Sequence, residues 1–146
     1  MFMVLNEDLG SYETTQKTMR KKILLVDDSP FFLKALSDAL SVDFHVETAG
    51  SGEKAINLLE EIDSAKPGDI GPFDLVITDL EMTGLSGYDV SQFIRNKNRS
   101  NKFIPVIMLT GKDITQEEAR GHGCAAYIPK TNLGKVVSMT RILLLR

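Results

Sequence analysis

Acidic side chains, one hydroxyl and one amine follow short apolar runs in this sequence. Asp27 and Asp28 follow the first run, Asp79 the third, Thr110 the fourth and Lys130 the fifth. If the runs are parallel strands of one sheet, their carboxyl ends form one edge, where open α/β sheets bind ligands. Each residue alone could cap a helix or face solvent, but their joint occurrence indicates a functional site.

The residue types at this edge predict phosphate chemistry. Crowded carboxylates repel one another unless a cation lies between them, and hard oxygen ligands suit Mg²⁺. A carboxylate can act as a nucleophile towards phosphorus. Phosphoryl transfer needs positioning and charge stabilisation, which Mg²⁺ and a lysine ammonium supply. The acyl phosphate carries about two negative charges, and a hydroxyl such as that of Thr110 can donate to its oxygens.

The pattern from Lys22 onward predicts the elements that position these side chains. Short apolar runs favour strands covered on both faces, and they are expected at residues 23–26, 44–48, 73–78, 104–109 and 125–128. A helix is expected after each run, with Ser29, Ser51, Ser86 and Thr115 as N-caps of the first four. Five strands alternating with five helices predict an α/β domain with a parallel sheet and right-handed crossovers.

Composition limits the class of protein and its partners. The chain has 146 residues, 42% hydrophobic and 25% charged, which is typical of one folded domain. Its net charge of −3 gives no basic field for direct nucleic-acid binding. Residues 1–20 are expected to be a flexible N-terminal extension, and 21–146 the folded domain.

The location expected from the sequence is cytoplasmic. Cys124 is the single cysteine, which rules out an intramolecular disulfide and fits a reducing compartment. No apolar run approaches the roughly 20 residues of a membrane span, so no membrane association is expected. The apolar start, residues 1–5, lacks the positively charged leader of a secretory signal.

Four stretches, in this order, resemble the motifs of two-component response regulator receiver domains. They are Ile23–Ser29, Asp79–Gly87, Pro105–Thr110 and Ala126–Lys130. The resemblance extends over about residues 20 to 145. It implies a flavodoxin-like (βα)5 fold, a doubly wound parallel five-stranded sheet with the strand order 2-1-3-4-5.

The resemblance also implies a role for each residue of the predicted site. Asp79 is the implied phosphoacceptor, and its phosphoryl group comes from a histidine kinase or a phosphotransfer protein. Mg²⁺ is the implied cofactor, bound by Asp28, Asp79 and the backbone carbonyl of Glu81, with Asp27 assisting indirectly. Lys130 is implied to contact the phosphoryl group. The domain would be a signalling element that assists only its own phosphorylation and dephosphorylation, and not an enzyme acting on other substrates.

Two further residues are implied to form a switch. Thr110 would move towards the phosphoryl group, and Tyr127 would turn inward to fill the space that Thr110 leaves. The surface around the fourth helix, the fifth strand and the fifth helix would then change for a downstream protein or an output domain of a longer chain. Receiver domains also commonly form homodimers through this surface.

The sequence departs from the family pattern at three places. Thr131 follows Lys130 where receivers usually have a proline after a cis peptide bond, and a cis bond before a non-proline residue costs about 2.5–4 kcal/mol. The path of this loop is therefore left open. Thr83 stands where proline is usual, and the interval from Thr110 to Tyr127 is short, which predicts a short fourth helix.

Two alternative functions are weighed. Residues 79–83 faintly resemble the nucleophile motif of haloacid dehalogenase-type phosphatases, but Glu81 replaces the usual aspartate and the motif follows the third strand instead of the first. A receiver-like module that binds partners without phosphorylation is favoured only by Thr131 and Thr83. The sequence leaves open whether the chain stands alone or is part of a longer regulator.

Overall fold

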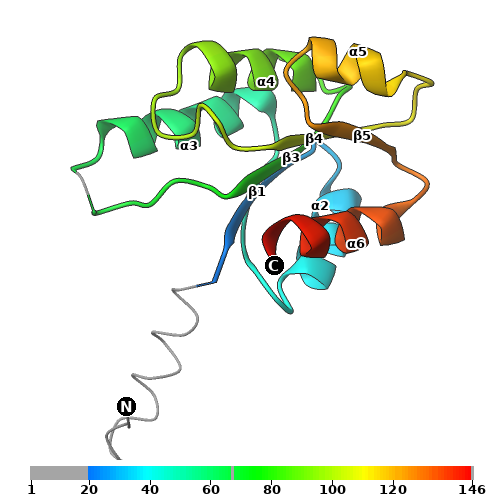
Figure 1. Cartoon of the computed structure of the whole chain (residues 1–146), viewed down its shortest axis with the longest axis horizontal. Coiled ribbons are helices and arrows are strands. Elements are labelled where there is room, and N and C mark those ends of the chain that lie inside the picture. The colour runs from blue at the N-terminus through cyan, green and yellow to red at the C-terminus, as the bar shows by residue number, and fades with distance from the viewer. Residues whose placement is uncertain (1–19, 67, 146) are drawn as a thin grey trace, which may run out of the picture.

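The computed structural model describes residues 20–66 and 68–145. Strands and helices alternate along the chain, as predicted (Figure 1). The extension expected at residues 1–20 lies, apart from Arg20, outside the described residues, and so does Arg146. The elements are β1 (Lys22–Val26), α2 (Pro30–Leu40), β2 (His45–Ala49), α3 (Gly52–Ser64), β3 (Leu75–Asp79), α4 (Gly87–Asn96), β4 (Val106–Thr110), α5 (Gln116–Gly121), β5 (Ala126–Pro129) and α6 (Leu133–Leu144).

The five strands form one parallel sheet in the order β2-β1-β3-β4-β5, which confirms the predicted topology. The predicted strand bounds differ from the observed ones by at most two residues at either end. The register places Asp79 beside Leu109 and Thr110 beside Pro129. The carboxyl ends of β1, β3, β4 and β5 therefore meet at one edge of the sheet.

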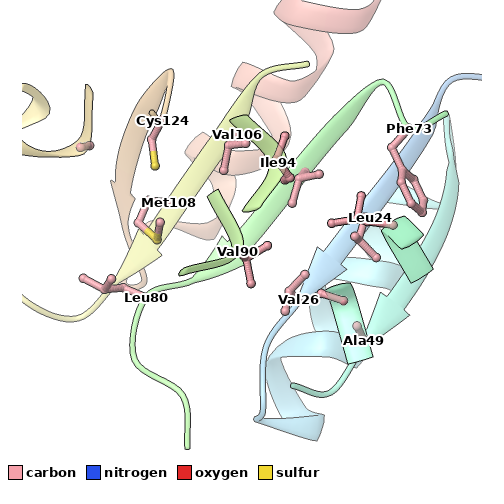
Figure 2. Close-up of a cluster of buried hydrophobic side chains, with 14 of the residues drawn as sticks. Leu24, Val26, Ala49, Phe73, Leu80, Val90, Ile94, Val106, Met108 and Cys124 are labelled. Atoms are coloured by element: carbon pink, nitrogen blue, oxygen red, sulfur yellow. The ribbon is translucent and has the colours of Figure 1, made fainter. Parts of the chain in front are cut away.

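Alternation along the strands divides the apolar core into two layers. On β1, Leu24 and Val26 face the layer beneath α3, α4 and α5, whereas Ile23 and Leu25 face the layer beneath α2 and α6. Figure 2 shows part of the first layer, with Leu24 and Val26 of β1 and Val106 and Met108 of β4 gathered in one cluster with Val90 and Ile94 of α4. Because both faces are covered, the central strands are buried along almost their whole length, as continuous apolar runs require.

All four predicted N-caps are confirmed. The hydroxyls of Ser29, Ser51, Ser86 and Thr115 each accept a hydrogen bond from a backbone N–H of the first helical turn. Ser86 forms a complete capping box, because the Asp89 carboxylate accepts a bond from the backbone N–H of Ser86. These bonds satisfy N–H groups that have no partner inside the helix.

The fourth helix along the chain, α5, is short, as predicted from the interval between Thr110 and Tyr127. It has six residues and ends at Gly121. Gly123 follows with φ +88°, a backbone conformation that favours glycine. The turn leads into Cys124, which is buried in the apolar core and whose thiol donates to the hydroxyl of Ser91. Within residues 20–66 and 68–145, no helix combines the length and apolarity needed to cross a bilayer.

Candidate functional site

Three carboxylates and an ammonium group meet at the carboxyl edge of the sheet. Oxygens of Asp27, Asp28 and Asp79 lie within 4.8 Å of one another. The Nζ atom of Lys130 lies 2.8 Å from Asp27 Oδ2 and 3.3 Å from Asp79 Oδ2. Asp27 and Asp79 are buried, Asp28 is exposed, and the Lys130 side chain is 17% exposed. The predicted cluster is therefore brought together, with an opening to solvent on the side of Asp28.

Backbone groups orient two of these carboxylates. The N–H of Ser29 donates to Asp27 Oδ1 at 2.9 Å, and the N–H of Thr83 donates to Asp28 Oδ2 at 3.1 Å. Proline has no N–H, so the residue usual in the family at position 83 could not make the second bond. The departure at Thr83 thus adds a contact that joins the β3–α4 loop to the end of β1.

Gly87, the first residue of α4, allows this helix to pack closely against the backbone of Asp79. A Cβ at position 87 would collide with the backbone carbonyl of Asp79 and would lie 2.7 Å from the Met108 sulfur. The N–H of Gly87 donates to the carbonyl of Leu80 at 3.0 Å, which fixes the start of α4 against the end of β3. Glycine at this position therefore allows the close approach of helix and strand behind Asp79.

Lys130 reaches the site without the cis peptide bond usual in the family. No peptide bond in the described ranges is cis, so the bond between Lys130 and Thr131 is trans. The Lys130 N–H donates to the carbonyl of Thr110 at 3.0 Å, which continues the pairing of β4 with β5. The sequence left the path of this loop open. In the structure the Lys130–Thr131 peptide bond is trans, and the Lys130 ammonium still contacts two carboxylates.

The charges of the site perturb one another. Burial, the largest cause, and the like charge of Asp27 raise the pKa of Asp79 to about 6, against the opposing effect of Lys130. Burial on its own lowers the pKa of Lys130, but its ion pairs with Asp27 and Asp79 outweigh this effect, and the pKa is raised. The ammonium therefore stays charged at neutral pH, and Asp79 is mostly ionised there.

The donor set fits a hard divalent cation. Oxygens of three carboxylates lie within 4.8 Å of one another, and one ammonium, that of Lys130, pairs with Oδ2 of Asp27 and of Asp79. Like charges this close repel one another, and a divalent cation between them would relieve the repulsion. Asp27, Asp28 and Asp79 could hold Mg²⁺, which binds through one or two carboxylates and retains water.

The predicted switch residues lie beside this cluster. Thr110 is buried, and its hydroxyl accepts a hydrogen bond from the N–H of Lys112 at 2.9 Å. Thr110, Tyr127 and Lys130 line a cavity of about 340 Å³. Tyr127 is partly buried and packs against the core beneath α5. Lys112, which lines the same cavity, also pairs with Glu81 at 3.2 Å, and both side chains are at least half exposed.

Two contacts near the site were missed from the sequence. The Lys130 ammonium lies 4.1 Å from the centroid of the Phe32 ring. The side-chain amide of Gln116 accepts a bond from the Tyr127 N–H at 3.0 Å and donates to the Tyr127 carbonyl at 3.1 Å. No sequence pattern pointed to the contact made by Gln116. The contact made by Phe32 could have been suspected, because an aromatic residue in the first helical turn after Asp27 and Asp28 lies close to the predicted site.

Comparison with known proteins gives consistent results. A sequence model described as the response regulator receiver domain matches residues 23–141. A probable cyclic di-GMP phosphodiesterase of Vibrio cholerae is 36% identical over 110 residues, which are 74% of this chain and 23% of that protein. The DNA-binding response regulator MtrA of Mycolicibacterium smegmatis is 32% identical over 116 residues, which are 77% of this chain and 45% of that protein. The chain thus spans less than half of these relatives.

Solved structures agree with this assignment. The phosphorylated cyanobacterial phytochrome response regulator RcpA superposes with a TM-score of 0.69 at 25% identity, covering 86% of this chain and 94% of that one. The family match extends over most of the described residues and includes the carboxylate cluster and every strand except the first residue of β1. The chain belongs to the response regulator receiver domain family and is a receiver domain of the two-component type.

Proposed function

We propose that Asp79 accepts a phosphoryl group in a Mg²⁺-dependent reaction, from a histidine kinase or a phosphotransfer protein. The observation that carries the proposal is the contact of one ammonium group with two of three clustered carboxylates, at the open edge of the sheet. In this arrangement Asp79 is a nucleophile flanked by a fixed positive charge. The likeness to a phosphorylated response regulator is consistent with this role.

The transfer assigns a role to each group. A carboxylate oxygen of Asp79 attacks phosphorus, the bond from phosphorus to the donor nitrogen breaks, and the imidazole leaves with the bonding electron pair and takes up a proton. Lys130 neutralises charge on the transferred phosphoryl oxygens. Mg²⁺ bound by Asp28, Asp79 and the Glu81 carbonyl, with Asp27 assisting, would neutralise further negative charge.

We infer that phosphorylation acts through the cavity beside Thr110. The phosphorylated state favours an arrangement in which the Thr110 hydroxyl donates to the phosphoryl group instead of accepting from Lys112. Tyr127 lines the same cavity and can turn into the space that Thr110 leaves. The surface formed by α5, β5 and α6 would then bind a downstream protein, an output domain or a second copy of the chain. The cytoplasmic location stays a prediction.

Intact mass spectrometry tests the proposal directly. Incubation with acetyl phosphate and Mg²⁺ should add one phosphoryl group to the wild-type chain. The addition should be lost with EDTA and in Asp79→Asn, while Asp38→Asn, a change of an exposed carboxylate on α2, should leave it intact.

Failure of the wild type with both acetyl phosphate and an active histidine kinase would contradict the proposal. That result would favour a receiver-like module that acts without phosphorylation. Steady turnover of a phosphate ester by the purified chain would instead support the phosphatase alternative.

A further inference from the structure

The ring of Phe32 lies against the ammonium group that the proposed reaction uses. Lys130 Nζ is 4.1 Å from the ring centroid, within the range of a cation–π contact. Phe32 comes from the first turn of α2, and Lys130 follows β5, 98 residues later in the sequence. The sheet order brings the two together across the carboxyl edge.

The ring completes the surroundings of the ammonium. Asp27 Oδ2 and Asp79 Oδ2 are 2.8 and 3.3 Å from Lys130 Nζ, and Phe32 supplies an aromatic face. A third carboxylate would compete with Asp79 for the positive charge. An aromatic face attracts a cation through its quadrupole without a lone pair directed at one hydrogen. It therefore restrains the ammonium while leaving its N–H groups free for oxygen acceptors.

Phe32 is not explained by core packing. Leu36 and Leu40 anchor α2 in the core with 1% of their surface exposed, and the partly buried Leu33 packs against the same cluster. Phe32 is partly buried, but among the described residues it belongs to neither apolar cluster and is not packed against one. Its neighbour Phe31 meets it edge to face and is 73% exposed.

We propose that Phe32 is a positioning residue that holds the Lys130 ammonium over the phosphoacceptor. This inference rests on the proposed function, in which Lys130 contacts the transferred phosphoryl group. A lysine side chain has several rotatable bonds and loses considerable entropy when it is fixed. A contact that restricts it before the donor arrives lowers the barrier to transfer. The ring also allows the ammonium to move from the Asp79 carboxylate to the phosphoryl oxygens, because the attraction depends little on direction.

The kinetic test uses Phe32→Leu, Phe32→Tyr and the neighbouring control Phe31→Leu. With acetyl phosphate at saturating Mg²⁺, Phe32→Leu should slow phosphorylation of Asp79 by about threefold to tenfold, as a partly desolvated cation–π contact implies. Phe32→Tyr restores the aromatic face and should stay within about twofold of wild type, and so should Phe31→Leu. Mg²⁺ affinity, measured by calorimetry, should be unchanged in all three, since no change touches a carboxylate.

A spectroscopic test needs no phosphorylation. The ε-CH₂ signals of Lys130, assigned by their loss in Lys130→Gln, should be shifted upfield by the ring current in wild type, Phe32→Tyr and Phe31→Leu. In Phe32→Leu they should move to the position of a solvated lysine. Should Phe32→Leu fold poorly, Phe32→Met provides a second variant without a ring.

The outcomes separate the two proposals. Unchanged Lys130 signals and an unchanged rate in Phe32→Leu and Phe32→Met would overturn the positioning role. A slower rate with unchanged Lys130 signals would also overturn it, because the effect would not pass through the ammonium. A ring-current shift that depends on Phe32 in a wild-type chain that accepts no phosphoryl group would support the contact and overturn the proposed function.

Discussion

The proposed reaction site and the proposed switching surface lie at neighbouring strands but are held in different ways. The site is attached to β1 and β3, whose residues are almost all buried between two helical layers. Asp27 directly follows four residues with 0% exposure, and Asp79 is the last residue of a fully buried strand. Apolar packing thus fixes the backbone that carries the reacting groups.

Two elements of the proposed switching surface, α5 and β5, are held mainly by polar contacts. Ala119 is the buried residue of α5, and β5 is an edge strand with one buried residue, Ile128. Side chains of α4 bind the end of α5 and the turn after it through hydrogen bonds from Tyr88 to Glu118, from Ser91 and Gln92 to His122, and from Arg95 to Gly123. The rings of Tyr88 and His122 also stack at 3.7 Å.

The two kinds of contact differ in how easily they are broken. Moving a packed strand opens cavities and costs several kcal/mol, whereas a hydrogen bond near the surface contributes about 0.5–1.5 kcal/mol and can be exchanged for one with water. A region with few buried apolar side chains and many polar contacts opens more easily than a packed core. This packing fits the proposed switch, in which Asp79 stays in place while α5 and β5 rearrange.

Removal of apolar packing beneath the site should have the largest effect. Leu25→Ala should lower the free energy of unfolding by about 3 kcal/mol, because it leaves a cavity beside β1. Urea denaturation at neutral pH measures it. Ile142→Ala, which changes an exposed aliphatic side chain on α6, should alter stability by less than about 0.5 kcal/mol. Equal effects of the two variants would contradict an apolar support for the site.

The charge of Asp79 should lower stability at neutral pH when no metal is bound. Its pKa is raised from 3.8 to about 6, so the folded state binds more protons than the unfolded state between these values. Stability should therefore fall as pH rises from about 4 to 6, and the loss should be complete above that range. Asp79→Asn removes the charge and should be more stable than wild type by about 3 kcal/mol at pH 7.5 in EDTA, since each pKa unit is worth about 1.4 kcal/mol.

Thermal and urea denaturation across this pH range measure the gain. It should shrink as pH falls below 6 and disappear by about pH 3, where Asp79 is protonated in both states. Asp38→Asn, on the exposed face of α2, is the control and should show no comparable gain. A gain in Asp79→Asn that does not depend on pH would show that the effect comes from packing and not from charge.

The smallest expected effect tests the polar attachment of the switching surface. Gln116→Ala removes the amide that binds both backbone groups of Tyr127. It should lower the local opening free energy by about 1 kcal/mol, which corresponds to roughly fivefold faster hydrogen exchange of the Tyr127 amide. The midpoint of global unfolding should stay nearly unchanged. Glu117→Ala, at the next position on the same turn, should leave the exchange of that amide unaffected. Equal exchange rates in both variants would contradict a stabilising role of the two Gln116–Tyr127 hydrogen bonds.

Local patterns were sufficient to predict the framework of the protein. Continuous apolar runs gave the five strands, because parallel strands covered on both faces have no polar side to alternate. Ser29, Ser51, Ser86 and Thr115 marked helix starts, because a capping hydroxyl acts within three residues of itself. The positions of Asp27, Asp79 and Lys130 after strands predicted that they would meet, since parallel strands end at one edge.

The contacts that refine the site depend on the tertiary structure. Phe32 meets Lys130, and Gln116 meets Tyr127, across separations that periodicity and capping rules do not describe. The trans path after Lys130 and the bond from Thr83 to Asp28 likewise follow from how loops of different strands lie side by side. The sequence by itself determined the elements and the edge where the chemistry lies, because those depend on neighbours along the chain. The tertiary structure decided which side chains come into contact there, because the order of strands in the sheet sets which residues far apart in the sequence lie within a few ångströms of each other.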